Sequence, residues 1–348
     1  MRTLTCIAVA LAATCAWPIS AGAVVGGEPL QQADVPWFTP VAGCGGTLVT
    51  PDRVLTAAHC VGGRSALEIG PTVIAGEPRT VTHVAMHPNF GHRNGENYLD
   101  DVAIVQLNAP VTSVAPVTLA GARSVTAPAR IIGFGNTYAP GTGRSEADML
   151  KGGLHQAVLR QVSDADCATV YRTNRPGTGE RFNAARMRCA VDVDGRQPLS
   201  SGCFGDSGGP LIAGSDAAPI QLGVTSWGGD RCGADHSPSV FADVSLYRDF
   251  ILDATPTWAP TQRYAADIRG SARVGKTLEC SATGRESGTH RRYEWKRRSG
   301  LAKLTTVGTA RTHRVSESDR GRRLFCFVTA YNDGGEILVG VDGVRAAG

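Results

Sequence analysis

Short apolar runs, several of them alternating with polar residues, recur along most of the chain and are separated by Gly and Pro. Residues 35–38 and 44–49 begin this succession, and residues 101–107 continue it with an acid that leads into an alternating run. Alternation with a period of two is typical of strands, and many short strands between turn residues are typical of barrels and sandwiches. We therefore predict an all-β fold.

The first 23 residues follow a different pattern. A basic start at Arg2 precedes an apolar run over residues 4–17, and the small residues Ala21, Gly22 and Ala23 follow it. This order is typical of a secretory signal peptide, and the run is too short and wrongly flanked for a membrane span. We predict a signal peptide over residues 1–23 and a secreted, extracellular protein with no membrane partner; a buried N-terminal helix is the alternative.

The length of 348 residues predicts two or three domains, since one ordinary domain has about 100–200 residues. The segment 255–262 contains spaced prolines and is predicted to be an extended, fairly stiff linker. Residues 24–254 and 263–348 are then the two folded parts. Hydrophobic residues make up 42% of the chain and charged residues 19%, a balance that is ordinary for globular proteins and unlike that of disordered chains.

Charge is divided unequally along the chain. Residues 260–348 carry 17 Lys and Arg against 9 Asp and Glu, a net charge of +8, whereas residues 1–259 carry 18 against 22, a net charge of −4. Five basic residues cluster around Trp295, namely Arg291, Arg292, Lys296, Arg297 and Arg298. In a strand, Lys296 and Arg298 face away from the side that Trp295 fills. The cluster predicts an anionic cell-wall or matrix polymer as a partner, and no nucleic acid; a basic surface that only aids solubility is the alternative.

The cysteine count bears on the compartment. Two of the ten cysteines lie in the predicted signal peptide, which leaves eight, an even number that predicts complete disulfide pairing in an oxidising compartment. The sequence alone does not assign the pairs. No thiol is then left over to act as a metal ligand or redox centre, and we predict no metal.

The stretch 202–210 carries the chemistry, because it places Ser207 in a glycine-rich turn. The glycines let the backbone bend tightly and leave the N–H groups of Gly205 and Ser207 free to bind an oxyanion. A serine hydroxyl is a poor nucleophile at neutral pH, so it needs a base and an orienting acid. Upstream, His59 and the acidic pair at 100–101 are the candidates.

The chain order His, Asp, Ser and the three local motifs resemble the trypsin and chymotrypsin family of serine proteases over about residues 24–254. The resemblance implies two six-stranded antiparallel barrels with the active site in the cleft between them. It also implies a catalytic triad of His59, Asp101 and Ser207. Asp100 is then expected to be solvated, since only one of two adjacent acids can point inward from the strand.

The resemblance implies roles for further residues. The freed amine of Val24 is expected to pair with Asp206 and so to shape the oxyanion hole, because buried opposite charges are tolerated only as a pair. Ser226 is expected to support the triad acid by hydrogen bonding. The substrate-binding residues implied are Ser201, Ser226, Trp227, Gly228 and Ser239.

The pocket residues also predict the specificity. Both Ser201 at the floor and Ser239 in the wall are neutral, so a substrate cation would lack a counter-charge there. Gly228 leaves the entrance open to a large side chain. We predict cleavage after large apolar residues; an inward-turned carboxylate of Asp230 or Asp235 is the alternative that would change this.

The cysteine pairs are likewise implied by the resemblance, which joins Cys44 to Cys60, Cys167 to Cys189 and Cys203 to Cys232, and leaves Cys280 and Cys326 for each other. The order of Cys280, Trp295 and Cys326 is similar to that of immunoglobulin-like domains, in which a tryptophan packs on an inter-sheet disulfide. This implies an Ig-like β-sandwich over residues 263–348, of the kind that serves as a binding or adhesion unit.

Two functions of different classes fit the sequence. The first is a secreted serine endopeptidase that hydrolyses protein or peptide substrates through an acyl-enzyme, without a cofactor. The second is a catalytically silent protease-like protein that serves in binding or adhesion. Such proteins normally lose a triad residue, and His59, Asp101 and Ser207 are all present, which favours the endopeptidase.

Overall fold

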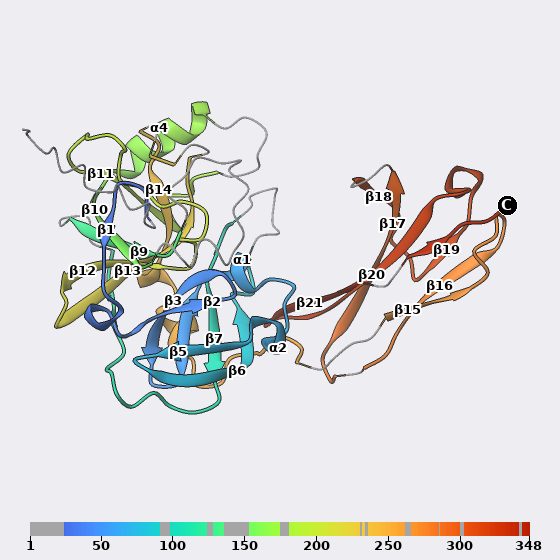
Figure 1. Cartoon of the computed structure of the whole chain (residues 1–348), viewed down its shortest axis with the longest axis horizontal. Helices are drawn as coiled ribbons and strands as arrows, with labels where there is room; N and C mark the ends of the chain where they lie inside the picture. The colour runs from blue at the N-terminus through green and yellow to red at the C-terminus, as the bar shows by residue number, and fades with distance from the viewer. Residues whose placement is uncertain are drawn as a thin grey trace, which may run out of the picture.

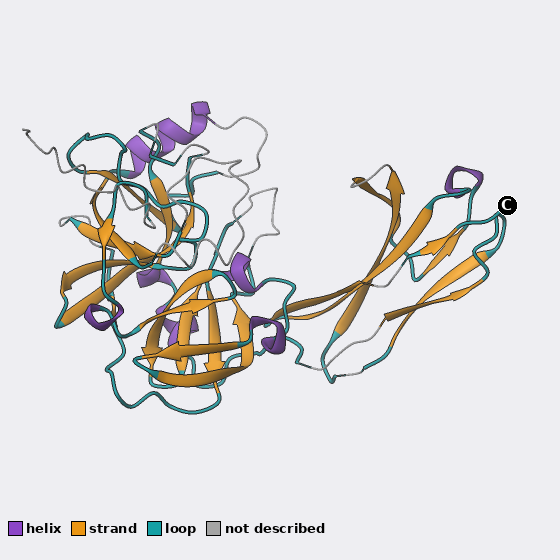
Figure 2. Ribbon diagram, in the orientation of Figure 1, coloured by secondary structure: helices purple, strands orange, loops and turns teal. Residues whose placement is uncertain are grey.

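The computed structural model describes residues 24–90, 98–123, 128–135, 153–174, 181–229, 232–233, 236–261, 266–284, 286–299, 303–340 and 343–348. The predicted signal peptide, residues 1–23, lies outside the described residues. Strands predominate throughout, and they form two barrels in the N-terminal part and an elongated C-terminal unit that projects from the first barrel (Figure 1, Figure 2).

The first barrel is an antiparallel sheet of six strands. Their spatial order is β2 (Phe38–Val41), β3 (Cys44–Thr50), β4 (Arg53–Thr56), β7 (Ala103–Leu107), β6 (Glu77–Met86) and β5 (Pro71–Ile74). Side chains join the two outer strands, since Thr39 Oγ1 donates to Val73 O at 3.1 Å and Thr72 Oγ1 donates to Pro40 O at 3.0 Å. These bonds close the sheet around a buried apolar core.

The second barrel is a closed ring of six antiparallel strands. Its order is β9 (Ala129–Gly133), β10 (His155–Gln161), β11 (Met187–Asp192), β14 (Ser239–Asp243), β13 (Ala218–Trp227) and β12 (Pro210–Ser215), with β12 pairing back to β9. Two short strands add to the ring, β1 (Glu28–Pro29) on β10 and β8 (Thr118–Leu119) parallel to β13. The prediction of an all-β fold with two six-stranded antiparallel barrels is confirmed.

The helices are short connections between strands. Those in the described ranges are α1 (Ala58–Val61), α2 (Ala66–Ile69), α4 (Asp164–Asn174) and α5 (Arg248–Leu252), with 3-10 turns η1 (Gln32–Asp34), η2 (Val244–Leu246) and η3 (Glu317–Asp319). Within the described ranges, no helix has the length and apolar character needed to cross a bilayer.

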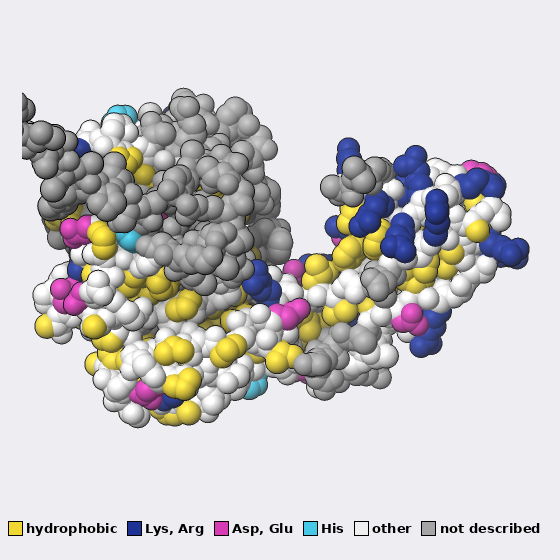
Figure 3. Space-filling view, viewed as in Figure 1, with side chains coloured by type: hydrophobic (Ala, Val, Ile, Leu, Met, Phe, Trp, Pro, Cys, Tyr) yellow, Lys and Arg dark blue, Asp and Glu magenta, His cyan; other side chains and the backbone are white. Residues whose placement is uncertain are grey.

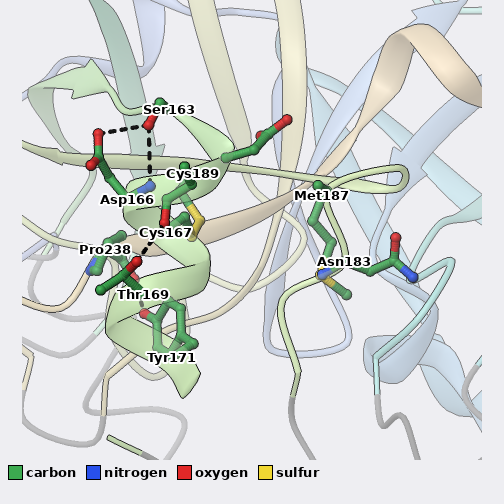
Figure 4. Close-up of a disulfide and its surroundings, with 12 residues drawn as sticks. Ser163, Asp166, Cys167, Thr169, Tyr171, Asn183, Met187, Cys189 and Pro238 are labelled. Carbon is green, nitrogen blue, oxygen red and sulfur yellow. Dashed lines mark hydrogen bonds between the residues drawn. A yellow bond between two sulfur atoms is a disulfide. The ribbon is translucent and has the colours of Figure 1, made fainter. Parts of the chain in front are cut away.

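Helix α4 is fixed to the second barrel at several points (Figure 4). A disulfide joins Cys167 in the helix to Cys189 in β11. Ser163 caps the N-terminal end of the helix, because its Oγ accepts a hydrogen bond from the backbone N–H of Asp166 at 3.1 Å. The hydroxyl of Tyr171 donates to the carbonyl of Pro238. Since Pro238 directly precedes β14, the helix also supports the start of that strand.

Four disulfides hold the chain, and they are the same four pairs that the family resemblance implies. They are Cys44–Cys60, Cys167–Cys189, Cys203–Cys232 and Cys280–Cys326, with sequence separations of 16, 22, 29 and 46 residues. Each joins two cysteines of the same barrel or of the C-terminal unit. Among the described residues, the barrels are therefore held to one another without a covalent cross-link.

The C-terminal unit consists of two facing sheets. One contains β15 (Ala266–Gly270), β16 (Thr277–Ala282) and β19 (Thr312–Arg314); the other contains β18 (Lys303–Gly308), β17 (His290–Ser299), β20 (Arg323–Asn332), β21 (Gly335–Gly340) and β22 (Val344–Arg345). Trp295 is fully buried against Cys280 and Cys326, and its Nε1–H donates to Ala310 O at 3.1 Å. This packing couples the two sheets through the disulfide.

The predicted linker lies against the first barrel. The backbone N–H of Ala259 donates to Val84 O in β6 at 2.6 Å. The guanidinium of Arg53 lies 5.7 Å from the centroid of the Trp258 ring, and its Nη2 donates to Ala254 O at 3.3 Å. The sequence predicted an extended, stiff segment here, and these contacts additionally fix its course.

Candidate active site

His59 and Asp101 meet at the junction of the two barrels. His59 lies in the one-turn helix α1, which directly follows β4, and Asp101 lies two residues before β7. Oδ1 of Asp101 accepts a hydrogen bond from the backbone N–H of His59 at 2.9 Å, and Oδ2 lies 2.7 Å from Nδ1 of the imidazole. Because a carboxylate accepts from Nδ1, the proton of the neutral ring is on Nδ1 and Nε2 is free to act as a base.

The second barrel supplies a further donor to the same carboxylate. Ser226, at the end of β13, donates from Oγ to Oδ2 of Asp101 at 2.5 Å. Asp101 is fully buried, so the three donors replace its hydration. Burial acts to lower the pKa of His59, but the charge of Asp101 and its hydrogen bond outweigh that effect and raise the pKa above its usual value.

Ser207 lies in a turn whose backbone requires glycine on both sides. Gly205 and Gly208 have φ of +97° and +75°, in the left-handed region that disfavours other residues. A Cβ on Gly208 would lie 2.3 Å from Thr56 Oγ1 and 2.5 Å from Gly45 O, so the turn packs directly against the first barrel. The backbone N–H of Gly45 donates to Ser207 O at 2.8 Å and fixes this approach.

The turn leaves two donors unused. Within the described residues, neither the N–H of Gly205 nor that of Ser207 donates a hydrogen bond, whereas those of Asp206, Gly208 and Gly209 all do. The N–H groups of residues 205 and 207, without such partners, can hold an oxyanion beside the serine hydroxyl.

His59 and Ser207 line one pocket of about 260 Å³, together with the wall residues Trp227, Gly228 and Ser239. No hydrogen bond joins Nε2 of His59 to Oγ of Ser207, two residues that the structure describes, and Nε2 lies 3.7 Å from Sγ of Cys60. Such hydrogen bonds are often long before substrate binds.

Comparison with known proteins agrees with this geometry. The family model described as Trypsin matches residues 24–251. The chain belongs to the trypsin family. A trypsin of Saccharopolyspora erythraea is 33% identical over 247 residues, which cover 66% of this chain and 97% of that protein. Kallikrein-2 of Homo sapiens is 28% identical over 268 residues, which cover 71% of this chain and 95% of that protein.

Among solved structures, the chain is similar to neuropsin, a serine protease expressed in the limbic system of mouse brain. It matches with a TM-score of 0.49 and 26% identity, covering 66% of this chain and 98% of that chain.

In this trypsin-family chain, Val24 and Asp206 lie together in the interior of the second barrel. Both are fully buried, and the backbone N–H of Val24 donates to the Asp206 carboxylate. The same carboxylate accepts from Gly135 N at 2.6 Å and Cys203 N at 2.9 Å. Burial raises the pKa of Asp206 to about 7, although these three hydrogen bonds act in the opposite direction.

The pocket residues expected for this trypsin-family chain separate into two groups. Trp227, Gly228 and Ser239 line the pocket beside Ser207, and Ser226 also reaches it. Ser201 instead lines a neighbouring cavity of about 410 Å³, and its buried Oγ has no hydrogen-bond partner among the described residues. Ser239 Oγ accepts from Gly202 N at 3.0 Å. Asp230 and Asp235, the two acids considered as alternatives, lie outside the described residues.

The expectation that Asp100 is solvated is wrong. Asp100 is buried, accepts a hydrogen bond from the Tyr247 hydroxyl at 2.9 Å, and lies 3.5 Å from Nε of Arg186. Its φ of +53° lies in the left-handed region, which is uncommon for a residue other than glycine. Both acids of the pair therefore point into the protein, each toward its own donors.

Tyr98 is a site residue that the sequence did not predict. Its ring stands edge-on to the imidazole of His59, with 5.1 Å between ring centroids, and it lines the same pocket as Ser207. An aromatic residue three positions before the triad acid is the only signal, and no motif surrounds it. Tyr171, whose ring centroid lies 4.5 Å from that of Trp227, was not predicted either, because it too lies outside any motif.

The site offers no metal ligands in the described part of the chain. Cys44, His59 and Cys60 are the one group there with suitable spacing, but the two sulfurs are joined in a disulfide. Metal ligation by cysteine requires thiolates, so this group is structural.

Proposed function

We propose that this trypsin-family protein is a secreted serine endopeptidase that works through an acyl-enzyme. The observation that supports this best is the buried Asp101, which orients His59 through two hydrogen bonds in the pocket that Ser207 also lines. The even set of eight disulfide-bonded cysteines supports secretion into an oxidising compartment.

In the proposed mechanism, Nε2 of His59 takes the proton of Ser207 as Oγ attacks the peptide carbonyl. Asp101 keeps the Nδ1–H tautomer and stabilises the imidazolium that forms. The N–H groups of Gly205 and Ser207 hold the oxyanion of the tetrahedral intermediate. His59 then gives its proton to the leaving amine, and a water molecule, activated by the same imidazole, hydrolyses the ester.

Labelling with a serine-directed phosphonylating reagent tests this function. We expect one equivalent of reagent on the mature protein, located on Ser207 by peptide mass, and no labelling of a Ser207→Ala variant. A folded protein that takes up no reagent and hydrolyses no peptide would instead support the catalytically silent binding protein.

We further propose cleavage after large apolar residues. The described pocket walls bear no carboxylate, the entrance at Gly228 has only Pro238 O and Ser239 Cα near its Cβ position, both at 3.7 Å, and the Ser239 side chain limits the depth. In otherwise identical peptides, kcat/KM for Phe, Tyr or Leu before the scissile bond should exceed that for Arg or Lys by at least about tenfold, because a buried cation would be unpaired. Faster cleavage after Arg would contradict this pocket assignment.

The C-terminal unit is proposed to be an Ig-like accessory unit that binds anions. Its Trp295 packs on the Cys280–Cys326 disulfide between two sheets, as expected for that fold. Lys296 and Arg298 point away from the core, as the alternation predicted. An anionic cell-wall or matrix polymer is one ligand of this chemistry.

A further inference from the structure

The hairpin between β20 and β21 attaches the C-terminal unit to the first barrel next to the helix that carries His59. The backbone N–H of Leu338 donates to Gly63 O at 2.9 Å, and Gly63 forms a parallel bridge with Ile337. At the hairpin tip, Met86 N donates to Gly334 O at 2.8 Å. Gly63 is four residues after His59, so at most about 14 Å of chain separates the joint from the proposed catalytic base.

The joint is closely packed. A Cβ on Gly334 would lie 2.1 Å from Thr257 O, and a Cβ on Gly335 would lie 2.7 Å from Cε of Met86. The Asn332 side chain donates from Nδ2 to Trp258 O at 2.9 Å. These contacts involve backbone on both sides, so the unit has a defined position relative to α1 in this structure.

The outer face of the larger sheet, the side opposite Trp295, consists of cations above aromatic rings. We define this outer face by Arg292, Lys296, Arg298, Phe325, Phe327 and Tyr331. The cations lie 5.3, 5.2 and 4.9 Å from the ring centroids of Tyr331, Phe327 and Phe325, respectively. Leu304 and Leu338 are exposed on the neighbouring strands at 38% and 48%. The face therefore combines positive charge with apolar area.

The charge of the outer face is only partly balanced. Arg292 pairs with Glu336, and Lys296 lies 3.0 Å from Glu294. Arg298 is exposed and forms no ion pair with any acid in the described ranges. Figure 3 shows Lys and Arg side chains gathered on the C-terminal unit in this view, while few appear on the first barrel. An acidic ligand is complementary to this surface.

The outer face begins beside the joint. Leu338, bonded to Gly63, is paired with Thr329, and Thr329 is paired with Arg292. Two inter-strand spacings of about 4.8 Å place Arg292 roughly 10 Å from Leu338. A groove of about 150 Å³ at the joint is lined by Met86, His87 and Phe90 of the barrel and by Arg292, Tyr331 and Glu336. The groove thus connects the barrel surface beside α1 with the outer face.

We propose that the outer face binds an acidic, extended segment of the protein substrate while the scissile bond occupies the cleft. The proposal rests on the proposed peptidase function and names its substrate class: proteins with acidic segments near the cleavage site. The fixed joint favours a substrate segment over a separate polymer, since a surface that only anchors the enzyme needs no fixed position on the barrel that carries His59.

Peptide hydrolysis by the full-length mature protein tests the proposal. The unextended peptide carries only the preferred apolar residue before the scissile bond. The extended peptides add a spacer of about eight Gly and Ser residues, which reaches roughly 25 Å, and then four Glu or four Gln. The extension is placed on the N-terminal side of the scissile bond in one set and on the C-terminal side in the other. We expect the Glu extension on one side to raise kcat/KM about three- to tenfold over Gln at low salt, through a lower KM. The gain should vanish at about 0.5 M NaCl, where exposed charges are screened.

The gain should depend on the outer face. A Lys296→Ala/Arg298→Ala double variant should lower the Glu-to-Gln ratio to about one. The matched control, Lys276→Ala/Arg314→Ala, removes one exposed Lys directly before β16 and one exposed Arg at the end of β19, both away from the outer face, and should keep the ratio. An equal ratio for Glu and Gln in the unmodified protein, or a gain that persists in the Lys296/Arg298 variant, overturns the proposal.

A joint variant separates position from charge. Gly334→Ala should displace the hairpin from Thr257 and lower the Glu-to-Gln ratio, while salt-sensitive retention on an anionic polysaccharide matrix stays as in the unmodified protein. Retention that requires Lys296 and Arg298, without any peptide gain, would show an anchoring surface and overturn the substrate proposal. Hydrolysis of the unextended peptide reports the peptidase function itself, so failure of that function is seen separately.

Discussion

Replacing Asp101 by Asn should lower kcat/KM for peptide hydrolysis about 10⁴-fold at neutral pH, a loss typical of a broken acid–histidine pair. Oδ1 of Asp101 accepts a hydrogen bond from the backbone N–H of His59, and Oδ2 accepts one from Nδ1 of the imidazole. Oδ2 also accepts a hydrogen bond from the hydroxyl of Ser226. The side-chain amide of Asn has only one acceptor oxygen, so it cannot accept hydrogen bonds from both the backbone N–H and Nδ1 of His59 in the way that the two carboxylate oxygens do. The ring is then driven to the Nε2–H tautomer, which cannot remove the proton of Ser207.

The pH profile of the Asn variant supplies a second readout. Asp101 raises the pKa of His59, so its loss lowers that pKa, and the acid limb of the residual activity should move to lower pH. Ser226→Ala is the matched control, because it removes one donor to the same carboxylate and keeps both bonds to His59; a loss of about tenfold is expected. An Asn variant that is folded and keeps a tenth of the activity would exclude the assigned role of Asp101.

Retaining one extra residue before Val24 should lower kcat/KM about 10²- to 10³-fold, the effect of losing an oxyanion-hole donor. Asp206 is fully buried and, among the described residues, has no Lys, Arg or His as an ion-pair partner. Val24 is the one neighbour that can provide a cation, provided that its amine is freed. Without it, the carboxylate is uncompensated, and the turn that positions Gly205 and Ser207 is destabilised.

Stability against pH distinguishes the two N-termini. With the amine blocked, the pKa of Asp206 is raised to about 7 from 3.8, so the folded state binds this proton more tightly than the unfolded state does. The melting temperature of the extended form should therefore fall as pH rises between about 4 and 7. In the mature form, the ammonium of Val24 lowers the pKa of Asp206 and removes this contribution.

Differential scanning calorimetry of the mature and extended forms from pH 4 to pH 8 measures the melting temperature of each. Asp206→Asn in the extended form should flatten the profile, because the titrating group is absent. Identical pH dependence in mature and extended forms would count against the Val24–Asp206 pair, as would full activity of a secreted protein that begins at Gly22 or earlier.

The parts of the site that the sequence predicted are those that depend on local backbone chemistry. The glycines around Ser207 are required by φ and by contact with Thr56, so the motif has few alternatives. The strands were predicted from the alternation of apolar and polar residues, because this alternation follows directly from burial of one face of a strand.

What the sequence did not predict depends on contacts between distant segments. The burial of Asp100 was not predicted, because its partners Tyr247 and Arg186 come from remote parts of the chain. No pattern at residues 100–101 indicates them. Ser201 lines a cavity other than the pocket beside Ser207, and its backbone pairs with the distant Val25. The joint at Gly63 was not predicted, because its partner is a hairpin more than 270 residues later in the chain. The glycines of that hairpin predict only an ordinary turn.

The four disulfides have spans that do not overlap along the chain: 44–60, 167–189, 203–232 and 280–326. A chain exported with its N-terminus first presents the two cysteines of each pair before the first cysteine of the next pair emerges. Native pairing can then follow the order of translocation, with no need for reshuffling by an isomerase. Oxidative maturation of this protein should accordingly tolerate hosts with little disulfide isomerase, and a chain truncated after the second barrel should still form its three remaining pairs.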